Sequence, residues 1–225
     1  MTNRVDFDQY TADYNKLLQE RTDFFTKDDG YFARYKVDLV KSKLKTPPRR
    51  ILEYGCGIGR NISFLQKCFP EAAIVGTDIS AASLDIARED YPGVQFILED
   101  ESLSNHDTFD LIFIAGVFHH IPVIERDKVA QKLRQRLSSD GDIFIFEHNP
   151  YNPITQRIVS TCPYDDDAVL LRPKELRQRL SGAGFQVKET DYCLFVPPSL
   201  PKLIWLERYL ARVPLGGQYV LHAKK

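Results

Sequence analysis

The sequence has few of the residues that build disulfide frameworks or structural metal sites. Its 225 residues include four cysteines, Cys56, Cys68, Cys162 and Cys193, and no two of them are spaced as Cys-x-x-Cys. Cysteines this sparse and this irregularly spaced argue against a secreted disulfide-linked domain and against a structural zinc site. We therefore predict no bound metal.

The sequence also lacks an excess of charge of either sign. Thirty lysines and arginines stand against 31 aspartates and glutamates, which gives a formal net charge of −1. A nucleic-acid-binding protein normally has a basic excess or a basic stripe. No apolar run approaches the ~20 residues that span a bilayer, and the polar first residues do not resemble a secretion signal. We expect a cytoplasmic protein with no nucleic-acid partner and no transmembrane segment.

Three glycines at alternate positions are the most informative feature that is present. Gly55, Gly57 and Gly59 follow the apolar segment 51–54. Glycine lets the backbone turn sharply and approach a ligand closely, and the N-terminus of a following helix favours polar ligands. A second apolar segment, 74–78, ends in Asp78, where a carboxylate can accept hydrogen bonds from both ribose hydroxyls of a nucleoside. The pattern predicts a nucleoside-containing cofactor.

The details of this pattern distinguish between cofactors. A dinucleotide fingerprint has glycine at its first, third and sixth positions, but the sixth residue counted from Gly55 is Arg60. The carboxylate of Glu53 would repel a pyrophosphate, whereas it suits a ligand with an ammonium and a sulfonium group. A further acid, Asp100, follows the apolar segment 94–98, where it can accept a hydrogen bond from an adenine amine. These acids favour S-adenosylmethionine over NAD.

Four motifs together resemble those of class I S-adenosylmethionine-dependent methyltransferases. They are Glu-Tyr-Gly-Cys-Gly-Ile-Gly, Gly-Thr-Asp-Ile-Ser, Glu-Asp and the segment 109–121, and they follow the family's order from about residue 51 to residue 147. Ile58 stands where the family more often has threonine. The resemblance is to stand-alone bacterial enzymes that act on small molecules or glycans. It implies that S-adenosylmethionine is held by Tyr14, Glu53, Gly55, Cys56, Gly57, Gly59, Asp78, Ile79, Asp100, Glu101, Ala115 and Gly116.

The alternation of apolar strands and helices after residue 51 indicates βαβ units and a parallel sheet covered on both faces. We predict an α/β, Rossmann-like doubly wound sheet, mostly parallel, with an antiparallel C-terminal hairpin strand as in the similar methyltransferases. The prediction is a single domain over 1–225, with an N-terminal helical cap at 1–46. The segments 149–172 and 197–214 interrupt the core pattern at the carboxyl ends of strands, and we expect them to be substrate-side lids.

Two further features concern the acceptor. His119, His120 and His148 follow the fourth and fifth core strands, where an imidazole can remove a proton from a hydroxyl acceptor, or can simply shape the loop. An apolar stripe around Trp205 is expected to be core, with a lipid-linked substrate as the alternative.

The predicted function is transfer of a methyl group to oxygen or nitrogen of a small-molecule, glycan or secondary-metabolite acceptor. An NAD-dependent oxidoreductase and a non-catalytic cofactor-binding or interaction module are the alternatives. The identity of the acceptor and the oligomeric state stay open.

Overall fold

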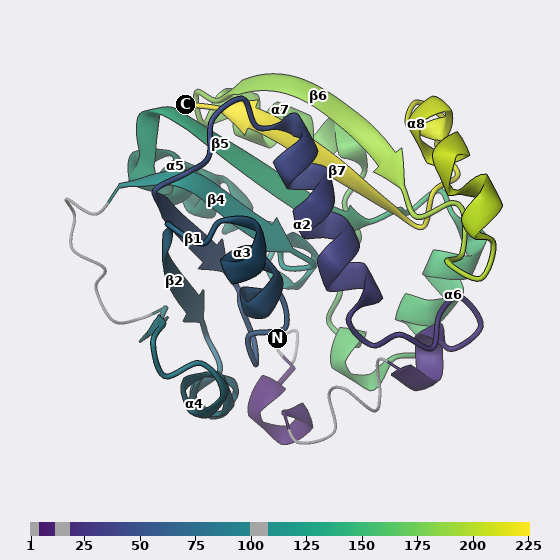
Figure 1. The fold of residues 1–225 in the computed structure, drawn as a ribbon, viewed down its shortest axis with the longest axis horizontal. Helices are drawn as coiled ribbons and strands as arrows, with labels where there is room; N and C mark the ends of the chain where they lie inside the picture. The colour runs from purple at the N-terminus through teal and green to yellow at the C-terminus, as the bar shows by residue number, and fades with distance from the viewer. Residues whose placement is uncertain (1–4, 12–18, 100–107) are drawn as a thin grey trace.

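A seven-stranded sheet forms the centre of the computed structural model, which describes residues 5–11, 19–99 and 108–225 (Figure 1). The strand order is β3-β2-β1-β4-β5-β7-β6. The strands are β1 (Arg50–Tyr54), β2 (Ala73–Asp78), β3 (Gln95–Leu98), β4 (Phe109–Ala115), β5 (Leu137–His148), β6 (Gln186–Cys193) and β7 (Gln218–Lys224). The α-helices are α2 (Tyr31–Lys43), α3 (Ile62–Cys68), α4 (Ala81–Asp90), α5 (Arg126–Arg136), α6 (Pro153–Ser160), α7 (Pro173–Gly182) and α8 (Glu207–Leu210). Short 3-10 helices are η1 (Phe7–Tyr10), η2 (Phe118–His120), η3 (Pro163–Asp165) and η4 (Pro201–Leu206).

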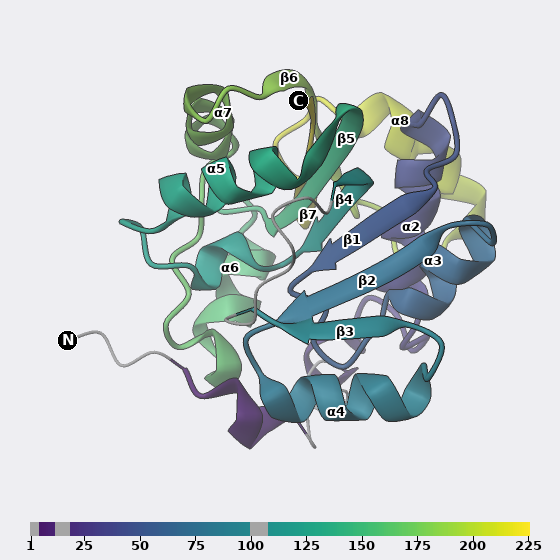
Figure 2. The same cartoon turned by 90° about the vertical axis from the view of Figure 1, so that its left-hand side faces the viewer.

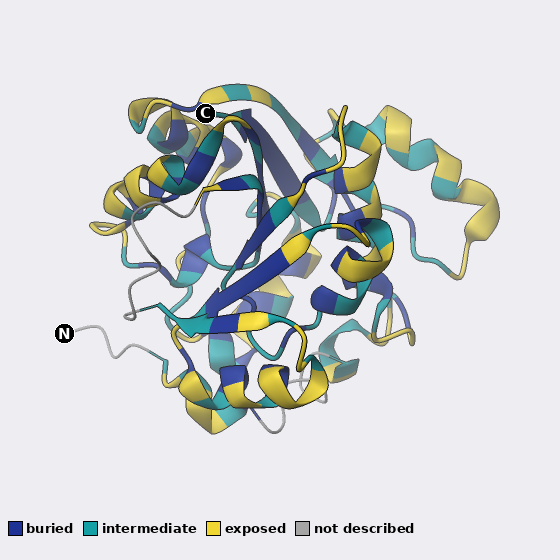
Figure 3. Ribbon diagram, turned by 60° about the vertical axis from the view of Figure 1, so that its left-hand side comes forward, coloured by how far each residue is buried: buried dark blue, intermediate teal, exposed yellow. Residues whose placement is uncertain are grey.

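The central strands are apolar along their whole length because both faces of the sheet are covered. In β4 the consecutive residues Leu111, Ile112, Phe113 and Ile114 are all fully buried, as expected for a strand in the middle of a parallel sheet. Side chains of α5 and α7 pack on one face, and side chains of α2, α3 and α4 pack on the other. Figure 2 shows α5 and α7 on the opposite side of the sheet from α2 and α3, and Figure 3 shows the buried central strands between them. This layering confirms the predicted fold.

The C-terminal strands give the sheet its mixed character. β1, β2, β3, β4 and β5 pair in parallel, whereas β7 is antiparallel to both β5 and β6. β7 therefore lies between β5 and the edge strand β6, and the predicted antiparallel hairpin is confirmed.

Two elements have features that the sequence analysis did not predict. β5 begins at Leu137, and its polar residues 138–140 are partly or fully exposed. The stripe around Trp205 is also not core, since the side chain of Trp205 is 55% exposed on η4 and Tyr209 on α8 is 62% exposed. The expectation that this stripe is buried was therefore wrong.

Segment 1–46 contains η1 and α2 within its described part. α2 ends at Lys43, shortly before Pro47 and Pro48, whose rings cannot continue a helix. Among the described residues no helix combines the length and the apolar character needed to cross a membrane.

Candidate active site

A cavity of about 1180 Å³ opens at the carboxyl ends of the parallel strands. Its wall includes the loops after β1, β2, β4 and β5, together with residues of α2, α6, η3 and the N-terminal segment 5–11. In an open α/β sheet this edge is where ligands bind. The cavity therefore brings together residues that are far apart in the sequence.

The glycine loop after β1 forms one end of this cavity. Gly55, Gly57 and Gly59 all have positive φ, at 72°, 54° and 82°. A Cβ on Gly55 would lie 2.4 Å from the side chain of Val117, so packing alone requires glycine there. A Cβ on Gly57 would meet no protein atom within 4 Å, and Gly57 lines the cavity. The loop thus leaves open space beside the backbone of Gly57, in which a ligand can lie.

Asp78 joins the glycine loop to the start of α4. One carboxylate oxygen accepts a hydrogen bond from the backbone N–H of Gly57 at 2.7 Å, and the other accepts one from the N–H of Ser80 at 2.9 Å. Burial raises the pKa of Asp78, and these backbone hydrogen bonds oppose that shift. The carboxylate is held in a fixed position on the cavity wall, next to the glycine loop.

Glu53 lies at the end of β1 and is 1% exposed. Its Oε1 accepts a hydrogen bond from Nδ2 of Asn61 at 2.6 Å, while its Oε2 has no hydrogen-bond partner among the described residues. Burial raises the pKa of Glu53 to about 8. A buried carboxylate oxygen without a donor is costly, so a cationic donor from a ligand would stabilise it.

The remaining predicted cofactor residues fall into two groups. Ile79, Cys56, Ala115 and Gly116 lie on the cavity wall, and Gly116 has a φ of 72°. Tyr14, Asp100 and Glu101 lie outside the described residues, so their predicted roles stay predictions. Two described neighbours of these residues, Tyr10 and Glu99, do line the cavity.

The segment 5–11 forms part of the cavity wall and is fixed at both of its ends. The hydroxyl of Ser80 donates to Asp8 at 2.5 Å, and the hydroxyls of Thr11 and Ser83 lie 3.2 Å apart. At the other end the backbone N–H of Val5 donates to Oδ2 of Asp167 at 3.0 Å. The segment therefore connects the start of α4 to the loop after η3.

The histidines line another part of the same cavity wall, and His119, on η2 after β4, is 2% exposed. Its Nδ1 lies 2.7 Å from Oε2 of Glu147, whose Oε1 accepts the backbone N–H groups of Val117 and Phe118. Burial lowers the pKa of His119, but the charges of Glu147 and Asp165 outweigh burial and raise the pKa to about 9. When no ligand is bound, His119 is therefore protonated at neutral pH.

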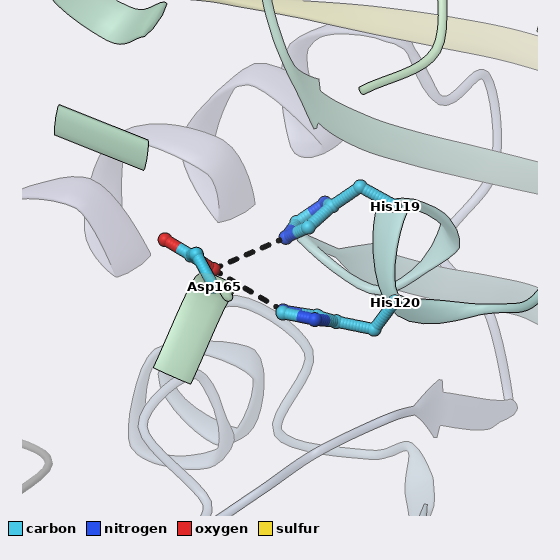
Figure 4. A group of neighbouring side chains, drawn as sticks. All are labelled: His119, His120 and Asp165. Carbon is cyan, nitrogen blue, oxygen red and sulfur yellow. Dashed lines mark ion pairs between the residues drawn. The ribbon is translucent and has the colours of Figure 1, made fainter. Parts of the chain in front are cut away.

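His120 is the second histidine of η2 and contacts a different carboxylate. Its Nδ1 lies 3.0 Å from Oδ1 of Asp167, and its Nε2 lies 3.3 Å from Oδ1 of Asp165. The ring of Phe7 packs edge-on against the imidazole, with centroids 5.0 Å apart. Figure 4 shows the side chains of His119 and His120 directed toward Asp165 from η2, with Asp165 coming from η3.

His148 ends β5 and lines the same cavity. Its ring centroid is 5.0 Å from that of His119. Burial, and next the charge of His119, lower the pKa of His148 to about 4. His148 is therefore the neutral imidazole next to a charged one.

Sequence reasoning missed several of the side chains that complete this end of the site. Arg126 is fully buried, and its guanidinium donates to the carbonyl of Ile121 at 2.9 Å and to that of Val169 at 2.7 Å, which holds the loops after η2 and η3 together. Lys36 of α2 lines the cavity, and burial lowers its pKa to about 8. Lys36 could have been found from the sequence, because it is a charged residue at helical spacing from Ala33 and Val40, which are buried on the inner face of α2. For Asp165 and Asp167 the signal was the run of three aspartates at 165–167.

The amino-acid sequence is similar to those of known methyltransferases over part of its length. Residues 51–141 match a family described as a methyltransferase domain. A trans-aconitate 2-methyltransferase from Methylobacterium nodulans is 35% identical over 112 residues, which are 49% of this chain and 39% of that protein. A malonyl-acyl-carrier-protein O-methyltransferase from Bacillus cereus is 31% identical over 128 residues, which are 54% of this chain and 47% of that protein. The chain thus spans less than half the length of each of these two relatives.

A solved structure extends the likeness to nearly the whole chain. A protein from Thermotoga maritima, described as an S-adenosylmethionine-dependent methyltransferase and possible histamine N-methyltransferase, aligns with a TM-score of 0.68 at 18% identity. The alignment covers 97% of this chain and 98% of that one, and at this identity it shows the fold. Residues 51–141 therefore match a methyltransferase domain, and the chain as a whole has the fold of S-adenosylmethionine-dependent methyltransferases.

Proposed function

We propose that this protein transfers a methyl group from S-adenosylmethionine to an oxygen or nitrogen atom of a small-molecule acceptor. One observation carries the proposal: the wall of a single cavity includes the glycine loop and Asp78, which we call the cofactor end, and the histidines of η2 and β5, which we call the acceptor end. The first end fits a nucleoside and the second fits an acceptor that loses a proton. The family and the methyltransferase relatives support the same reading.

The cofactor end fits S-adenosylmethionine on two structural observations. The unpartnered Oε2 of Glu53 is available to a cationic ammonium group, and the space beside Gly57 is available to the cofactor body. Asp78 would accept hydrogen bonds from the ribose hydroxyls, because its carboxylate already lies on the cavity wall. In this proposal Asp100 and Glu101 contact the adenine, and Tyr14 closes over the methionine portion.

S-adenosylmethionine supplies a methyl group on a positively charged sulfur, so transfer breaks the S–CH₃ bond and forms a bond to the acceptor atom. The protein needs to align the two reactants, exclude water and accept the proton that a hydroxyl acceptor releases. The segment 5–11 contributes to water exclusion, because it closes part of the cavity wall between α4 and the loop after η3.

His148 is the residue that we assign as proton acceptor among the three candidate histidines. His119 lies between Glu147 and Asp165 and holds its proton, with a pKa of about 9, so it is a poor base at neutral pH. His148 is neutral at that pH and lines the cavity. Its basicity is modest, which fits a role in taking up a proton as the methyl bond forms rather than before.

The acceptor is inferred from the charge of the cavity. Lys36 places an amine on the wall near Glu53, Glu147 and His148, and it favours an acceptor that carries an acidic or strongly polar group. The two curated relatives are named for trans-aconitate and for a malonyl thioester, which are small acids. We therefore place small organic acids ahead of glycans and lipid-linked acceptors in the substrate panel.

Calorimetry tests the proposal and separates it from its rivals. S-adenosylhomocysteine should bind the protein and NADH should not, because the carboxylate of Glu53 repels a pyrophosphate and Arg60 stands where a dinucleotide fingerprint has glycine. Asp78→Ala should weaken S-adenosylhomocysteine binding by at least about tenfold, since a hydrogen bond to a charged group contributes ~1.5–3 kcal/mol. Asp85→Ala, at an exposed position of α4, is the matched control and should bind normally.

Two outcomes would overturn the assignment. Preferential binding of NADH would favour the oxidoreductase. Normal S-adenosylmethionine binding with no methyl transfer to any member of a panel of organic acids, glycans and lipid-linked acceptors would favour a cofactor-binding module without activity.

A further inference from the structure

We propose that His119, His120 and Asp165 bind one divalent first-row transition-metal ion, represented by Zn²⁺, at the acceptor end of the cavity. The sequence analysis predicted no bound metal, because the three residues share no short motif: Asp165 follows His120 by 45 positions. The structure brings them together through η2 and η3, as Figure 4 shows. The ion's role in catalysis rests on the proposed function, whereas its binding does not.

The spacing of the three donor atoms fits one ion. Oδ1 of Asp165 lies 3.3 Å from Nε2 of His120 and 3.7 Å from Nε2 of His119, and the ligand atoms of all three residues lie within 4.8 Å of one another. Two ligands bound at about 2.1 Å to one ion in tetrahedral geometry lie roughly 3.4 Å apart. Binding an ion therefore requires shifts of only a few tenths of an ångström for the two distances from Asp165.

The second nitrogen of each histidine is held as it is in established metal sites. Nδ1 of His119 lies 2.7 Å from Glu147, and Nδ1 of His120 lies 3.0 Å from Asp167. A carboxylate at Nδ1 fixes the proton there, so the lone pair of Nε2 points away from that carboxylate, and it raises the basicity of the ring. Both imidazoles have this arrangement, and both direct Nε2 toward Asp165.

The charge of the group requires a cation. The carboxylates of Glu147, Asp165 and Asp167 surround two imidazoles that are neutral when they act as ligands. Asp165 is 6% exposed, and its Oδ1 has no hydrogen-bond partner among the described residues. Buried charge of one sign is costly unless it is paired or coordinates a metal. A dication at Oδ1 compensates this charge and gives the unpartnered oxygen a ligand bond.

The site keeps an open side toward the cavity, because all three residues line the cavity wall. Two imidazoles, one carboxylate and an open position form a donor set typical of catalytic zinc and non-haem iron sites. An oxygen of the acceptor, from a hydroxyl or a carboxylate, completes the coordination there. A bound dication lowers the pKa of a hydroxyl that it contacts, so it favours acceptors that methylate on oxygen.

Titration of the metal-stripped full-length chain with Zn²⁺ tests the site directly. We expect one ion per chain, and a visible spectrum of bound Co²⁺ with nitrogen and oxygen ligands. Asp167→Asn, which changes the partner of His120 at Nδ1 and leaves all three proposed ligands in place, should weaken Zn²⁺ binding by about 10- to 100-fold. Asp165→Ala should weaken it further, and the isosteric Asp165→Asn repeats the test if the alanine variant does not fold. His222→Gln, which removes a histidine paired with Asp142 on the far side of the sheet, should bind Zn²⁺ normally.

Each outcome decides the proposal. Absence of Zn²⁺ binding by the wild-type chain, or equal binding by wild type and the Asp165 variants, would overturn it and leave a metal-free ion-pair cluster. S-adenosylhomocysteine titrated into the same samples separates this result from the proposed function. If Zn²⁺ binds and S-adenosylhomocysteine does not, the methyltransferase assignment fails while the metal site stands.

Discussion

The two ends of the cavity are built in opposite ways. The cofactor end comes from a continuous stretch of about 25 residues, from Glu53 to Asp78. Its main determinants are the backbone conformation of the glycine loop and the carboxylates of these two residues. The acceptor end is assembled from side chains of α2, η2, β5 and η3, which are separated by as many as 129 positions, from Lys36 to Asp165. One end is encoded locally, and the other exists only after the chain has folded.

The buried carboxylates of the two ends also differ in charge state. At the cofactor end, burial raises the pKa of Glu53 to about 8 and also raises that of Asp78. At the acceptor end, the pKa values of Glu147 and Asp165 are lowered despite burial, because the histidines stabilise their charged forms. The cofactor end therefore awaits a cationic donor from a ligand, whereas at the acceptor end the histidines oppose the carboxylates as long as no metal ion is bound.

The largest effect is expected from removing the assigned base at the acceptor end. His148→Ala should lower the methyl-transfer rate by about 10²- to 10⁴-fold, because a positioned general base contributes that much. The affinity for S-adenosylhomocysteine should stay the same, since His148 is not among the residues that we assign to cofactor binding. His222→Ala is the matched control on β7 and should keep the wild-type rate.

The pH profile sharpens this prediction. The low pKa of His148, about 4, keeps its imidazole neutral through pH 6.5. The wild-type rate should therefore fall only as the pH approaches that value, below the range of an unperturbed histidine. A fall centred near pH 6.5, or an active His148→Ala enzyme, would show that another group takes the proton or that positioning alone is enough.

Gly57→Val tests whether the cofactor end depends on its backbone. Valine disfavours a φ of 54°, and its side chain would fill the space that is open beside the loop. We expect S-adenosylhomocysteine binding to fall by roughly 100-fold or more, a larger loss than for Asp78→Ala, because strain at such a position costs ~1–3 kcal/mol before any clash with the ligand.

Gly93→Val provides the matched control for this variant. Gly93 also has no atom within 4 Å of a built Cβ, but it lacks a positive φ and lies in the turn before β3. The Gly93→Val variant should bind S-adenosylhomocysteine with the wild-type affinity. Near-wild-type affinity in Gly57→Val would show that the loop does not wrap a ligand.

The contrast between the two ends explains which features the sequence could reveal. The sheet, its parallel core and the antiparallel C-terminal pair follow from apolar periodicity and from the resemblance, and the glycine motif predicts a cofactor-binding loop. The pairing of His119 with Glu147 depends on the register of β4 beside β5, and Asp165 reaches the histidines because Arg126 ties the loops after η2 and η3 together. Trp205 shows the same limit: helical spacing predicted a buried stripe, but Leu203 and Trp205 are exposed in the folded chain.

A further prediction concerns the charge of Glu53, and it tests the difference in charge state between the carboxylates of the two ends. A carboxyl whose pKa rises from 4.5 when unfolded to about 8 when folded binds more protons in the folded state between these values. Its contribution to stability is therefore present below pH 4.5 and is lost as the pH rises toward 8, at up to about 1.4 kcal/mol per pH unit. Glu53→Gln should flatten the dependence of the free energy of unfolding on pH over this range, as measured by urea denaturation.

The same carboxyl should couple cofactor binding to proton release. An ammonium group next to the unpartnered Oε2 favours the charged form, so binding of S-adenosylhomocysteine at pH 7 should release a fraction of one proton. Calorimetry in buffers of different ionisation enthalpy measures this fraction, which should vanish in Glu53→Gln and persist in Glu89→Gln, an exposed control on α4. Equal proton release by wild type and Glu53→Gln would mean that the carboxylate does not face the cofactor's ammonium group, and Glu53 would then serve only to hold Asn61 at the start of α3.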